Sequence, residues 1–450
     1  MYIIMLSGGS GKRLWPLSND LRSKQYIKVI SHEDNTDKAC SMVQRVWHQL
    51  EKADLNKNCI ITASKGQVEI IKSQLGDVNI AVEPERRDTF PAIMLSLAYL
   101  KSQLGAKDDE AVAVIPVDPY TEQEYFTLLS SLDTVLEKSG SEIALMGATP
   151  NEPSEKFGYI VPENDFGEYL TVNHFEEKPS KEHAKELIEK GALWNCGVFC
   201  FKIGSLLKKL KSYGLSESYE DVYKNYGKLP KISFDYEVLE KAKSIAVARL
   251  DTMWKDLGTW NALCEQMNSR SIGNAVIHES CENTNILNEL DIPIVAMGTK
   301  DVIISASFDG ILVSDKDTST KVKECVDKFN YPPMYEERRW GTIKVIDITK
   351  KKNVYTTTRK IHIFEQTNSS YHYHNNRDEV WTILEGNGEI IINGIRQLLT
   401  TGDVIRIPKG TKHAIKSIDG ICFIEVQIGT TVADSDINRI TFDWNEIDKK

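Results

Sequence analysis

The chain begins with Met1-Tyr-Ile-Ile-Met-Leu6 and continues as Ser7-Gly-Gly-Ser-Gly-Lys-Arg-Leu-Trp-Pro-Leu17. The first six residues are a short apolar run, which is typical of a buried β-strand. Gly8, Gly9 and Gly11 follow it directly. Glycine lets a backbone approach a ligand closely and adopt positive φ, and successive N–H groups in such a turn can hold phosphate oxygens. This stretch therefore predicts an α/β domain with a phosphate-binding loop after its first strand.

Two common phosphate loops do not fit this glycine-rich turn. A Walker A loop needs Ser or Thr after its Lys, but Lys12 is followed by Arg13. A dinucleotide fingerprint needs a further glycine three residues past Gly11, where Leu14 stands. A plain strand–helix turn is the alternative interpretation. The neighbouring Lys12-Arg13 pair and the later Lys24-Gln25 favour phosphate binding.

Short apolar runs and helical patterns alternate along the first half of the chain. The runs predict strands at Tyr2–Leu6, Cys59–Thr62, Val78–Val82, Ala111–Val114 and Ile143–Met146. Spacing of three to four residues predicts helices such as Pro91–Leu100, capped by Asp88 or Thr89, and Lys181–Lys190, preceded by Ser180. This alternation predicts an α/β domain over residues 1–269, with a mostly parallel sheet covered by helices.

The pattern changes after this domain. Short apolar pieces from Arg270 to Asp317 predict a small all-β connecting segment, and Thr318–Phe329 predicts one helix, so that the segment spans 270–330. From 331 to 450, short strand-like pieces recur, with a hairpin signal at Asn393-Gly394. They predict a C-terminal β-barrel or jelly roll.

Composition excludes several classes of protein. The chain has 450 residues, 27% charged and 41% hydrophobic, with a net charge of −10. We therefore expect no nucleic-acid partner, because such binding needs surplus Lys and Arg. We also expect no membrane segment and no secretory signal. Eight scattered cysteines without a CxxC pair indicate reduced thiols and a cytoplasmic protein.

The glycine-rich stretch resembles the GGxGTRLWPLS signature of sugar-phosphate nucleotidyltransferases, specifically of the mannose-1-phosphate guanylyltransferases. Further segments are similar to motifs of this family, and they run through the whole first domain: Ser23–Gln25, Glu83–Ile93, Val114–Asp118, Phe157–Ile160, Phe175–Pro179, Trp194–Phe199, Phe234–Val238 and Trp254–Trp260. The resemblance implies a Rossmann-like, GT-A-like nucleotidyltransferase domain. It also implies transfer of a nucleoside monophosphate from a triphosphate, most simply GTP, to a sugar 1-phosphate such as α-D-mannose 1-phosphate. The products would be GDP-mannose and pyrophosphate.

The same resemblance implies roles for individual residues. Asp118 and Asp256 would hold Mg²⁺, Arg13 and Lys24 would face the triphosphate, and Lys178 would hold the phosphate of the sugar. The nucleotide pocket would be lined by Gly8, Gly9, Gly11 and Arg87. The sugar would be contacted by Gly158, Glu177, Asn195 and Asp235. These residue types suit a reaction that depends on positioning and on neutralising phosphate charge.

Some positions depart from the family pattern near the nucleotide. Lys12 replaces a Thr, Arg86 a Gly and Asp88 an Asn, and Pro119-Tyr120 stands where the family has His. The choice of base therefore stays open. One alternative is a nucleotidyltransferase for another sugar or base, for example CTP, with a C-terminal barrel that only binds sugar or mediates assembly. A non-catalytic sensor of sugar nucleotides is another.

The C-terminal part carries a second pattern of candidate ligands. His372, His374 and Glu379 precede Gly386, and His413 follows Gly402 and Pro408. The spacing of these two groups resembles the two cupin motifs. Alternate residues of a strand share a face, and three imidazoles with one carboxylate suit Zn²⁺ or another divalent metal. The alternatives are three surface histidines, or a vestigial barrel without metal.

Arg339–Gly341, Arg377–Trp381 and Glu425–Gly429 resemble the type II phosphomannose isomerase domain, which implies a second activity as mannose-6-phosphate isomerase. A histidine of that family is replaced by Asn376. The base of an isomerase would be Glu379, if it is not a ligand, or a residue that the sequence does not place. We also expect a homodimer.

Overall fold

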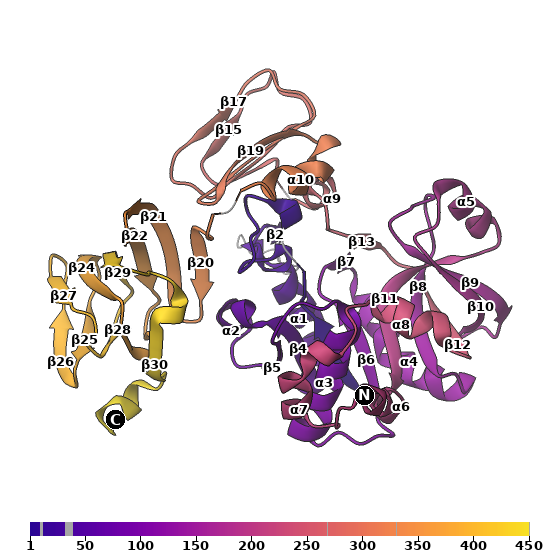
Figure 1. The fold of residues 1–450 in the computed structure, drawn as a ribbon. Coiled ribbons are helices and arrows are strands. Elements are labelled where there is room, and N and C mark those ends of the chain that lie inside the picture. The colour runs from indigo at the N-terminus through magenta and orange to yellow at the C-terminus, as the bar shows by residue number, and fades with distance from the viewer. Residues whose placement is uncertain (10–11, 32–38, 268, 330, 450) are drawn as a thin grey trace.

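The computed structural model describes residues 1–9, 12–31, 39–267, 269–329 and 331–449, which form three parts (Figure 1). The first part is built on a nine-stranded sheet with the order β5-β4-β1-β6-β11-β8-β12-β10-β9. Its strands are β1 (Tyr2–Leu6), β4 (Cys59–Ser64), β5 (Asn79–Glu83), β6 (Ala111–Pro116), β8 (Ile143–Ala148), β9 (Gly158–Asp165), β10 (Leu170–Glu177), β11 (Leu193–Lys202) and β12 (Ile245–Leu250). The five strands predicted in this part are confirmed within two residues at each end.

Strand β1 lies between β4 and β6 and is parallel to both. Successive side chains of a strand point to opposite faces: Ile3 and Met5 belong to one hydrophobic core and Ile4 to another. Helices α1 (Met42–Lys52) and α4 (Gln123–Ser139) cover the first core, and α3 (Thr89–Leu104) covers the second. Burial on both faces explains why β1 is a continuous apolar run.

Capping residues explain where the predicted helices start. Asp88 precedes α3 and accepts a hydrogen bond from the backbone N–H of Thr89. Ser180 precedes α5 (Lys181–Glu189) and accepts one from the backbone N–H of His183. The far half of the sheet is mixed, because β11 runs antiparallel to both β6 and β8. The sheet is therefore parallel from β5 to β6, and β9 and β10 form an antiparallel pair beyond it.

The connecting segment is a small stack of short strands. They are β14 (Ser271–Ile272), β15 (Ala275–Ile277), β16 (Asn285–Asn288), β17 (Ile294–Ala296), β18 (Val302–Ser307) and β19 (Gly310–Asp315). The single helix predicted over Thr318–Phe329 is wrong in detail. A 3₁₀ turn, η8 (Thr318–Lys321), precedes a short helix, α10 (Val322–Val326). Asp315 accepts the backbone N–H groups of Asp317 and Thr318, which favours a tight turn there.

The C-terminal part consists of two packed antiparallel sheets. One has the order β20-β21-β22-β29-β24-β27 and the other β26-β25-β28-β23-β30. The strands are β20 (Tyr335–Arg338), β21 (Gly341–Lys351), β22 (Val354–Ile363), β23 (Tyr371–His374), β24 (Arg377–Glu385), β25 (Gly388–Ile392), β26 (Ile395–Leu399), β27 (Val404–Ile407), β28 (His413–Ser417), β29 (Ile421–Gly429) and β30 (Ile437–Thr441). Asn393 and Gly394 both have positive φ between β25 and β26, as the hairpin signal predicts.

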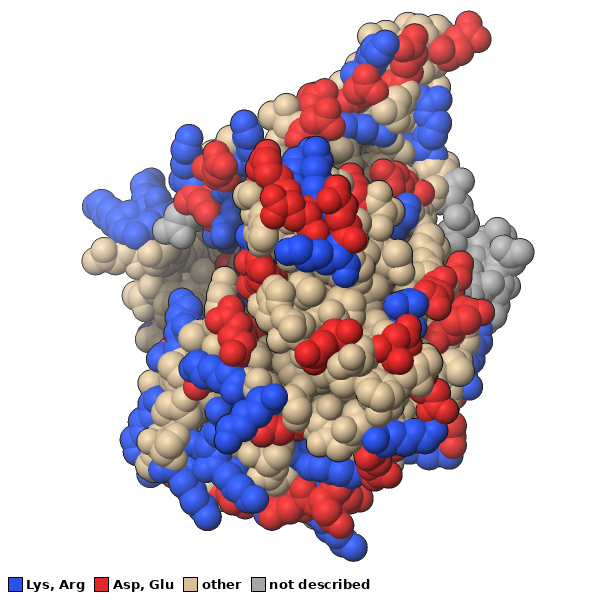
Figure 2. All heavy atoms as spheres, turned by 90° about the vertical axis from the view of Figure 1, so that its right-hand side faces the viewer, with Lys and Arg blue, Asp and Glu red and all other residues tan. Residues whose placement is uncertain are grey.

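Among the described helices, none is both long and apolar enough to cross a bilayer. The described cysteines are free thiols, and all but Cys325 are buried. On the face shown in Figure 2, Lys and Arg side chains are interspersed with Asp and Glu side chains.

Candidate functional site

The glycine turn lies at the carboxyl end of β1, where β6 also ends. Gly9 has a φ of 130°, a conformation that L side chains rarely adopt. The 3₁₀ turn η2 (Lys24–Tyr26) is bound to this region, because Gln25 Nε2 donates to Ser7 O at 2.7 Å. Ser23 Oγ donates to Gly9 O at 3.3 Å. These bonds place Lys24 beside the turn.

Lys24, Asp118 and Asp256 come together from three distant parts of the sequence. Lys24 Nζ lies 2.6 Å from Asp118 Oδ2 and 3.2 Å from Asp256 Oδ1. Asp118 follows β6, and Asp256 ends the short strand β13 (Trp254–Asp256). β13 pairs with β7 (Pro119–Thr121) so that Asp256 lies opposite Pro119, next to Asp118. This two-stranded ribbon brings the two carboxylates together.

The charges of this cluster stabilise one another. Burial by itself would raise the pKa of Asp118, but the ammonium of Lys24, with a smaller effect of Arg13, lowers that pKa below its usual value. Burial likewise opposes the charge of Lys24, and the two carboxylates nevertheless raise the pKa of its ammonium. The site thus holds the carboxylate of Asp118 and the ammonium of Lys24 in their charged forms. Arg13, on η1 (Lys12–Leu14), acts on it through its charge.

A second cluster contains the residues predicted to contact the sugar. Lys178 Nζ pairs with Glu177, and Asn195 Nδ2 donates to Asp235 Oδ1 at 3.0 Å. Gly158 lies opposite Glu177 in the β9–β10 pair. A Cβ at Gly158 would come within 2.6 Å of both Glu177 Oε2 and Phe175 Cζ, so a larger residue there would displace these two side chains.

Asp235 lies in the short helix α8 (Phe234–Glu237). Burial, together with the charge of Glu177, raises the pKa of Asp235 to about 6. One residue of each cluster, Asp118 and Asp235, lines a common cavity of about 740 Å³. Their partners Lys24, Asp256, Lys178, Glu177 and Asn195 are not among its lining residues. A cavity of this size accommodates a ligand as large as a nucleotide sugar.

This cavity contains most of the predicted nucleotide residues and several that sequence reasoning missed. Gly8, Gly9 and Arg87 line it, as the resemblance implies. Gly11 lies outside the described residues. Glu83, Lys231 and Lys323 also line the cavity and were not singled out as site residues. Glu83 lies in a quoted motif and could have been found there. Lys323 comes from a segment without a recognisable motif.

Three of the positions that depart from the family pattern make specific contacts in this structure. Lys12 Nζ lies 2.8 Å from Asp327 Oδ1, a partner in the connecting segment. Arg86 pairs with Asp20 at 3.0 Å. Asp88 has a φ of 74°, which Asp and Asn tolerate better than most residues, and it caps α3. Arg86 and Asp88 line the cavity, so they are placed to influence the choice of base.

In the C-terminal part, the ring nitrogens of His372, His374 and His413 lie within 4.8 Å of one another. Glu379 joins them, with Oε1 3.0 Å from His374 Nε2 and Oε2 3.5 Å from His413 Nε2. His372 lies opposite His413 in the β23–β28 pair, which explains their proximity. The alternative of three surface histidines in turns is wrong, because His374 and His413 are buried and His372 is half-buried.

Hydrogen bonds orient all three rings in the same way. Nδ1 of His372, His374 and His413 lies 2.7, 3.2 and 2.9 Å from the carbonyl oxygens of Ser370, Asp436 and Thr411, respectively. A carbonyl only accepts, so each Nδ1 carries the proton and each Nε2 offers a lone pair. The Nε2 atoms of His374 and His413 are buried and make no hydrogen bond of good geometry with a described group. This donor set fits a divalent metal ion and its usual outer-shell carbonyl partners.

The electrostatics of the cluster favour a neutral His372 and a charged Glu379. Burial, with the neighbouring His413, lowers the pKa of His372 well below its usual value. Burial would raise the pKa of Glu379, but His374 and His413 outweigh it, so that this pKa is well below the usual value. Gln427 Nε2 and Trp381 Nε1 donate to Glu379 at 2.9 and 3.1 Å.

Asn376, which replaces a family histidine, is not part of this cluster. Its Nδ2 donates to Asp436 Oδ1 at 2.7 Å. The imidazole of His372 therefore completes the triad by way of the general cupin spacing.

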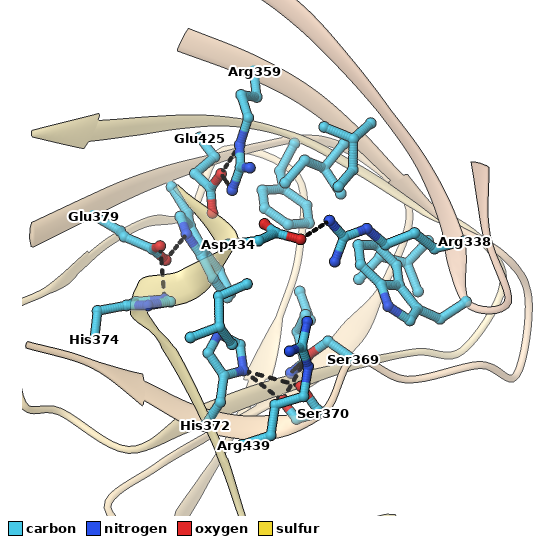
Figure 3. Close-up of a pocket in the computed structure, with 18 of the residues that line it drawn as sticks. Arg338, Arg359, Ser369, Ser370, His372, His374, Glu379, Glu425, Asp434 and Arg439 are labelled. Atoms are coloured by element: carbon cyan, nitrogen blue, oxygen red, sulfur yellow. Dashed lines mark hydrogen bonds and ion pairs between the residues drawn. The ribbon is translucent and has the colours of Figure 1, made fainter. Parts of the chain in front are cut away.

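Beside the triad lies a cavity of about 70 Å³ with charged walls. In Figure 3, His372, His374, Arg338 and Arg439 point toward the same space. Arg359 pairs with Glu425 at the back of the cavity. Burial raises the pKa of Glu425 to about 7, even though Arg359 opposes the shift. The cavity thus combines candidate metal ligands, arginines and a carboxylate that can exchange a proton near neutral pH.

Comparison with known proteins agrees with this arrangement. The nucleotidyl transferase family matches residues 2–271, and the mannose-6-phosphate isomerase C-terminal family matches residues 333–442. The first match covers more than half of the chain, so this chain belongs to the nucleotidyl transferase family. The family predicted from the sequence is thereby confirmed.

Three proteins with known names are similar to this chain over most of its length. Mannose-1-phosphate guanylyltransferase of Salmonella montevideo is 28% identical, over 97% of this chain and 98% of that protein. Xanthan biosynthesis protein XanB of Xanthomonas campestris pv. campestris (strain B100) is 27% identical, over 97% of each chain. The crystal structure of mannose-1-phosphate geranyltransferase from Thermus thermophilus matches with a TM-score of 0.60 and 26% identity, over 73% of this chain and 98% of that one.

Proposed function

We propose that the chain transfers GMP from GTP to α-D-mannose 1-phosphate and forms GDP-mannose and pyrophosphate. The observation that carries this proposal is the shared cavity. One cavity is lined by Gly8 and Gly9 of the glycine turn, by Asp118, which pairs with Lys24, and by Asp235, whose pKa responds to the charges of Glu177 and Lys178. Relatives that align over nearly the whole chain are mannose-1-phosphate guanylyltransferases, which supports this sugar and this base.

The chemistry is an in-line displacement at the α-phosphorus of the nucleotide. A phosphate oxygen of the sugar 1-phosphate forms the new P–O bond, and pyrophosphate leaves with the electrons of the broken bond. The backbone of Gly8 and Gly9, together with Arg13 and Lys24, binds the triphosphate. Lys178 holds the phosphate of the sugar, and Glu177, Asn195 and Asp235 orient its hydroxyl groups. The chain thereby supplies orientation and charge neutralisation rather than a nucleophile.

Asp118 and Asp256 would hold Mg²⁺, because paired carboxylates are the ligands that this ion prefers. When bound, the ion would neutralise the charge that moves onto the departing pyrophosphate. Lys24, which lies between the two carboxylates, holds them close together.

A pyrophosphate-release assay tests this proposal, with ATP, GTP, CTP, UTP and dTTP offered against several sugar 1-phosphates. The expected result is highest kcat/KM for GTP with mannose 1-phosphate, and loss of activity in Asp118→Ala and Asp256→Ala. Preference for another triphosphate would favour the alternative nucleotidyltransferase, and Arg86 and Asp88 would be the first residues to exchange. Full activity of the Asp118→Ala, Asp256→Ala double variant would refute the site.

We propose a second activity for the C-terminal part, the interconversion of fructose 6-phosphate and mannose 6-phosphate. The oriented histidine triad favours it over an assembly role, since a scaffold does not need three Nε2 lone pairs facing one point. His372, His374, His413 and Glu379 would hold a divalent metal ion such as Zn²⁺, which would polarise the sugar carbonyl when bound.

Isomerisation also needs a base for the neighbouring C–H group, and Glu425 is our candidate because its pKa lies near neutrality. An assay that couples mannose 6-phosphate formation to a dehydrogenase tests this activity. Isomerase activity in the metal-loaded protein that disappears in His374→Ala and in Glu425→Gln is the expected result. Absence of activity in the metal-loaded wild type would leave the barrel a binding module.

We also propose that the chain forms a homodimer through its connecting segment. Apolar side chains that are more than half exposed gather there: Val276, Ile292, Val295, Met297, Ile311 and Val313. Apolar patches of this kind mark interaction sites. Light scattering after gel filtration is expected to give twice the chain mass for the wild type and the single-chain mass for a Val295→Asp, Val313→Asp variant.

A further inference from the structure

The connecting segment packs against the stretch that follows the glycine turn. Helix α10 contacts η1, and Lys12 of η1 forms its ion pair with Asp327 just after α10. The ring centroids of Trp15 and Phe329 are 6.4 Å apart. Two further residues of the segment bind the same stretch, because Ser307 Oγ donates to Pro16 O at 2.6 Å and Asp309 Oδ2 accepts from Asn19 Nδ2 at 2.7 Å. The segment therefore holds residues 12–19 in place from outside the first domain.

From α10, the side chain of Lys323 reaches the cavity that Gly8, Gly9 and Asp118 line. Lys323 is exposed, and it forms no ion pair with another described residue. Its charge acts weakly on Asp327, four residues later in the chain, and helps to lower the pKa of that carboxyl. The acidic groups of the cavity have their own partners, such as Tyr226 for Glu83 and Asn195 for Asp235. Lys323 thus brings a positive charge that is not paired with any described carboxylate of the cavity.

We propose that Lys323 binds phosphate oxygens of the nucleoside triphosphate, so that the nucleotide site of the first domain is completed by the connecting segment. The inference rests on the proposed transferase function. The triphosphate is the expected ligand rather than the sugar phosphate, because α10 packs beside the glycine turn while Lys178 serves the other cluster. A triphosphate is highly anionic, and each additional cation in its site strengthens binding.

Steady-state kinetics of pyrophosphate release test this proposal with three variants. Lys323→Ala is expected to raise the KM for GTP about tenfold, the usual effect of losing one hydrogen bond to a charged group. The KM for mannose 1-phosphate should change less than about twofold. Lys323→Arg should recover most of the lost affinity, because guanidinium also binds phosphate. Lys321→Ala is the matched control, since Lys321 is exposed on the preceding turn and does not line the cavity.

Two results would overturn the proposal. One is an unchanged KM for GTP in Lys323→Ala, and the other is a larger effect on mannose 1-phosphate than on GTP. Should the wild type release no pyrophosphate from these substrates, the transferase function itself fails. Calorimetric titration of wild type and Lys323→Ala with Mg-GTP then decides on Lys323, because equal dissociation constants would exclude it from the site.

Discussion

Replacing Lys24 by Met removes the charge that Asp118 and Asp256 share, while a side chain of similar length remains. The ammonium of Lys24 lies 2.6 and 3.2 Å from the two carboxylates. Without it, both carboxylates face each other with no counter-ion between them. We therefore expect the metal-free variant to be less stable than the metal-free wild type.

The size of this effect follows from distance and exposure. Two unit charges about 4 Å apart interact by about 4 kcal/mol at an effective dielectric constant of about 20. The side chains of Lys24, Asp118 and Asp256 are 20%, 34% and 39% exposed, so water screens part of this attraction and already solvates the carboxylates. We expect a net loss of about 1–3 kcal/mol, between the values for exposed and buried ion pairs. For a domain of this size, that corresponds to a decrease in Tm of roughly 3–10 °C.

Thermal unfolding with and without Mg²⁺ measures this prediction. Mg²⁺ should raise the Tm of Lys24→Met more than that of the wild type, because the variant has no cation of its own between the carboxylates. Lys57→Met is the control. Lys57 pairs with Asp54 at a similar 2.8 Å, but the two side chains are 73% and 76% exposed, so Tm should hardly change. Equal Tm values for Lys24→Met and wild type, or equal shifts with Mg²⁺, would refute the reasoning.

Three further predictions concern other parts of the molecule. Lys178→Ala should raise the KM for mannose 1-phosphate about tenfold and leave the KM for GTP nearly unchanged. The exposed control Lys181→Ala should leave both KM values nearly unchanged. A larger effect of Lys178→Ala on GTP than on mannose 1-phosphate would mean that the two pockets are exchanged. Burial raises the pKa of Asp235 from 3.8 to about 6, so its carboxylate predominates only above about pH 6. Binding of the sugar 1-phosphate should therefore strengthen as the pH rises through about 6. Asp235→Asn should abolish this inflection in the plot of binding affinity against pH. By linkage, the same raised pKa makes the protonated side chain favour the folded state, so its contribution to stability declines as the pH rises from 3.8 to about 6 and is constant above. Zn²⁺ at about a hundredfold excess over its dissociation constant should stabilise the C-terminal part by about 2.7 kcal/mol, as measured by calorimetry. His413→Ala should remove this stabilisation, whereas the control His362→Ala, at an exposed histidine, should retain it.

Much of the first domain could be predicted from the sequence, because the interactions that fix its strands and helix ends involve residues close together in the chain. Tyr2–Leu6 is apolar at every position since both faces of β1 are buried, and such a run cannot be an exposed strand. Asp88 and Ser180 marked helix starts because an oxygen side chain satisfies a free backbone N–H there. The hairpin at Asn393-Gly394 followed from the positive φ that its turn requires. The helix over Thr318–Phe329 was wrong in detail, because its first turn is a 3₁₀ turn and the α-helix ends at Val326.

The sequence alone determined that this chain has a glycine-rich turn after its first strand, acids and cations in the motifs that follow, and imidazoles with cupin spacing, because those properties belong to residue types and short intervals. Only the tertiary structure decided which of them meet. Asp256 reaches Asp118 through the β7–β13 ribbon, His413 reaches His372 through the pairing of β23 and β28, and Lys323 reaches the cavity beside Gly8 and Gly9 through the packing of α10 on η1. Such meetings depend on strand order and on the burial of surfaces far apart in the chain, and no local interval encodes them.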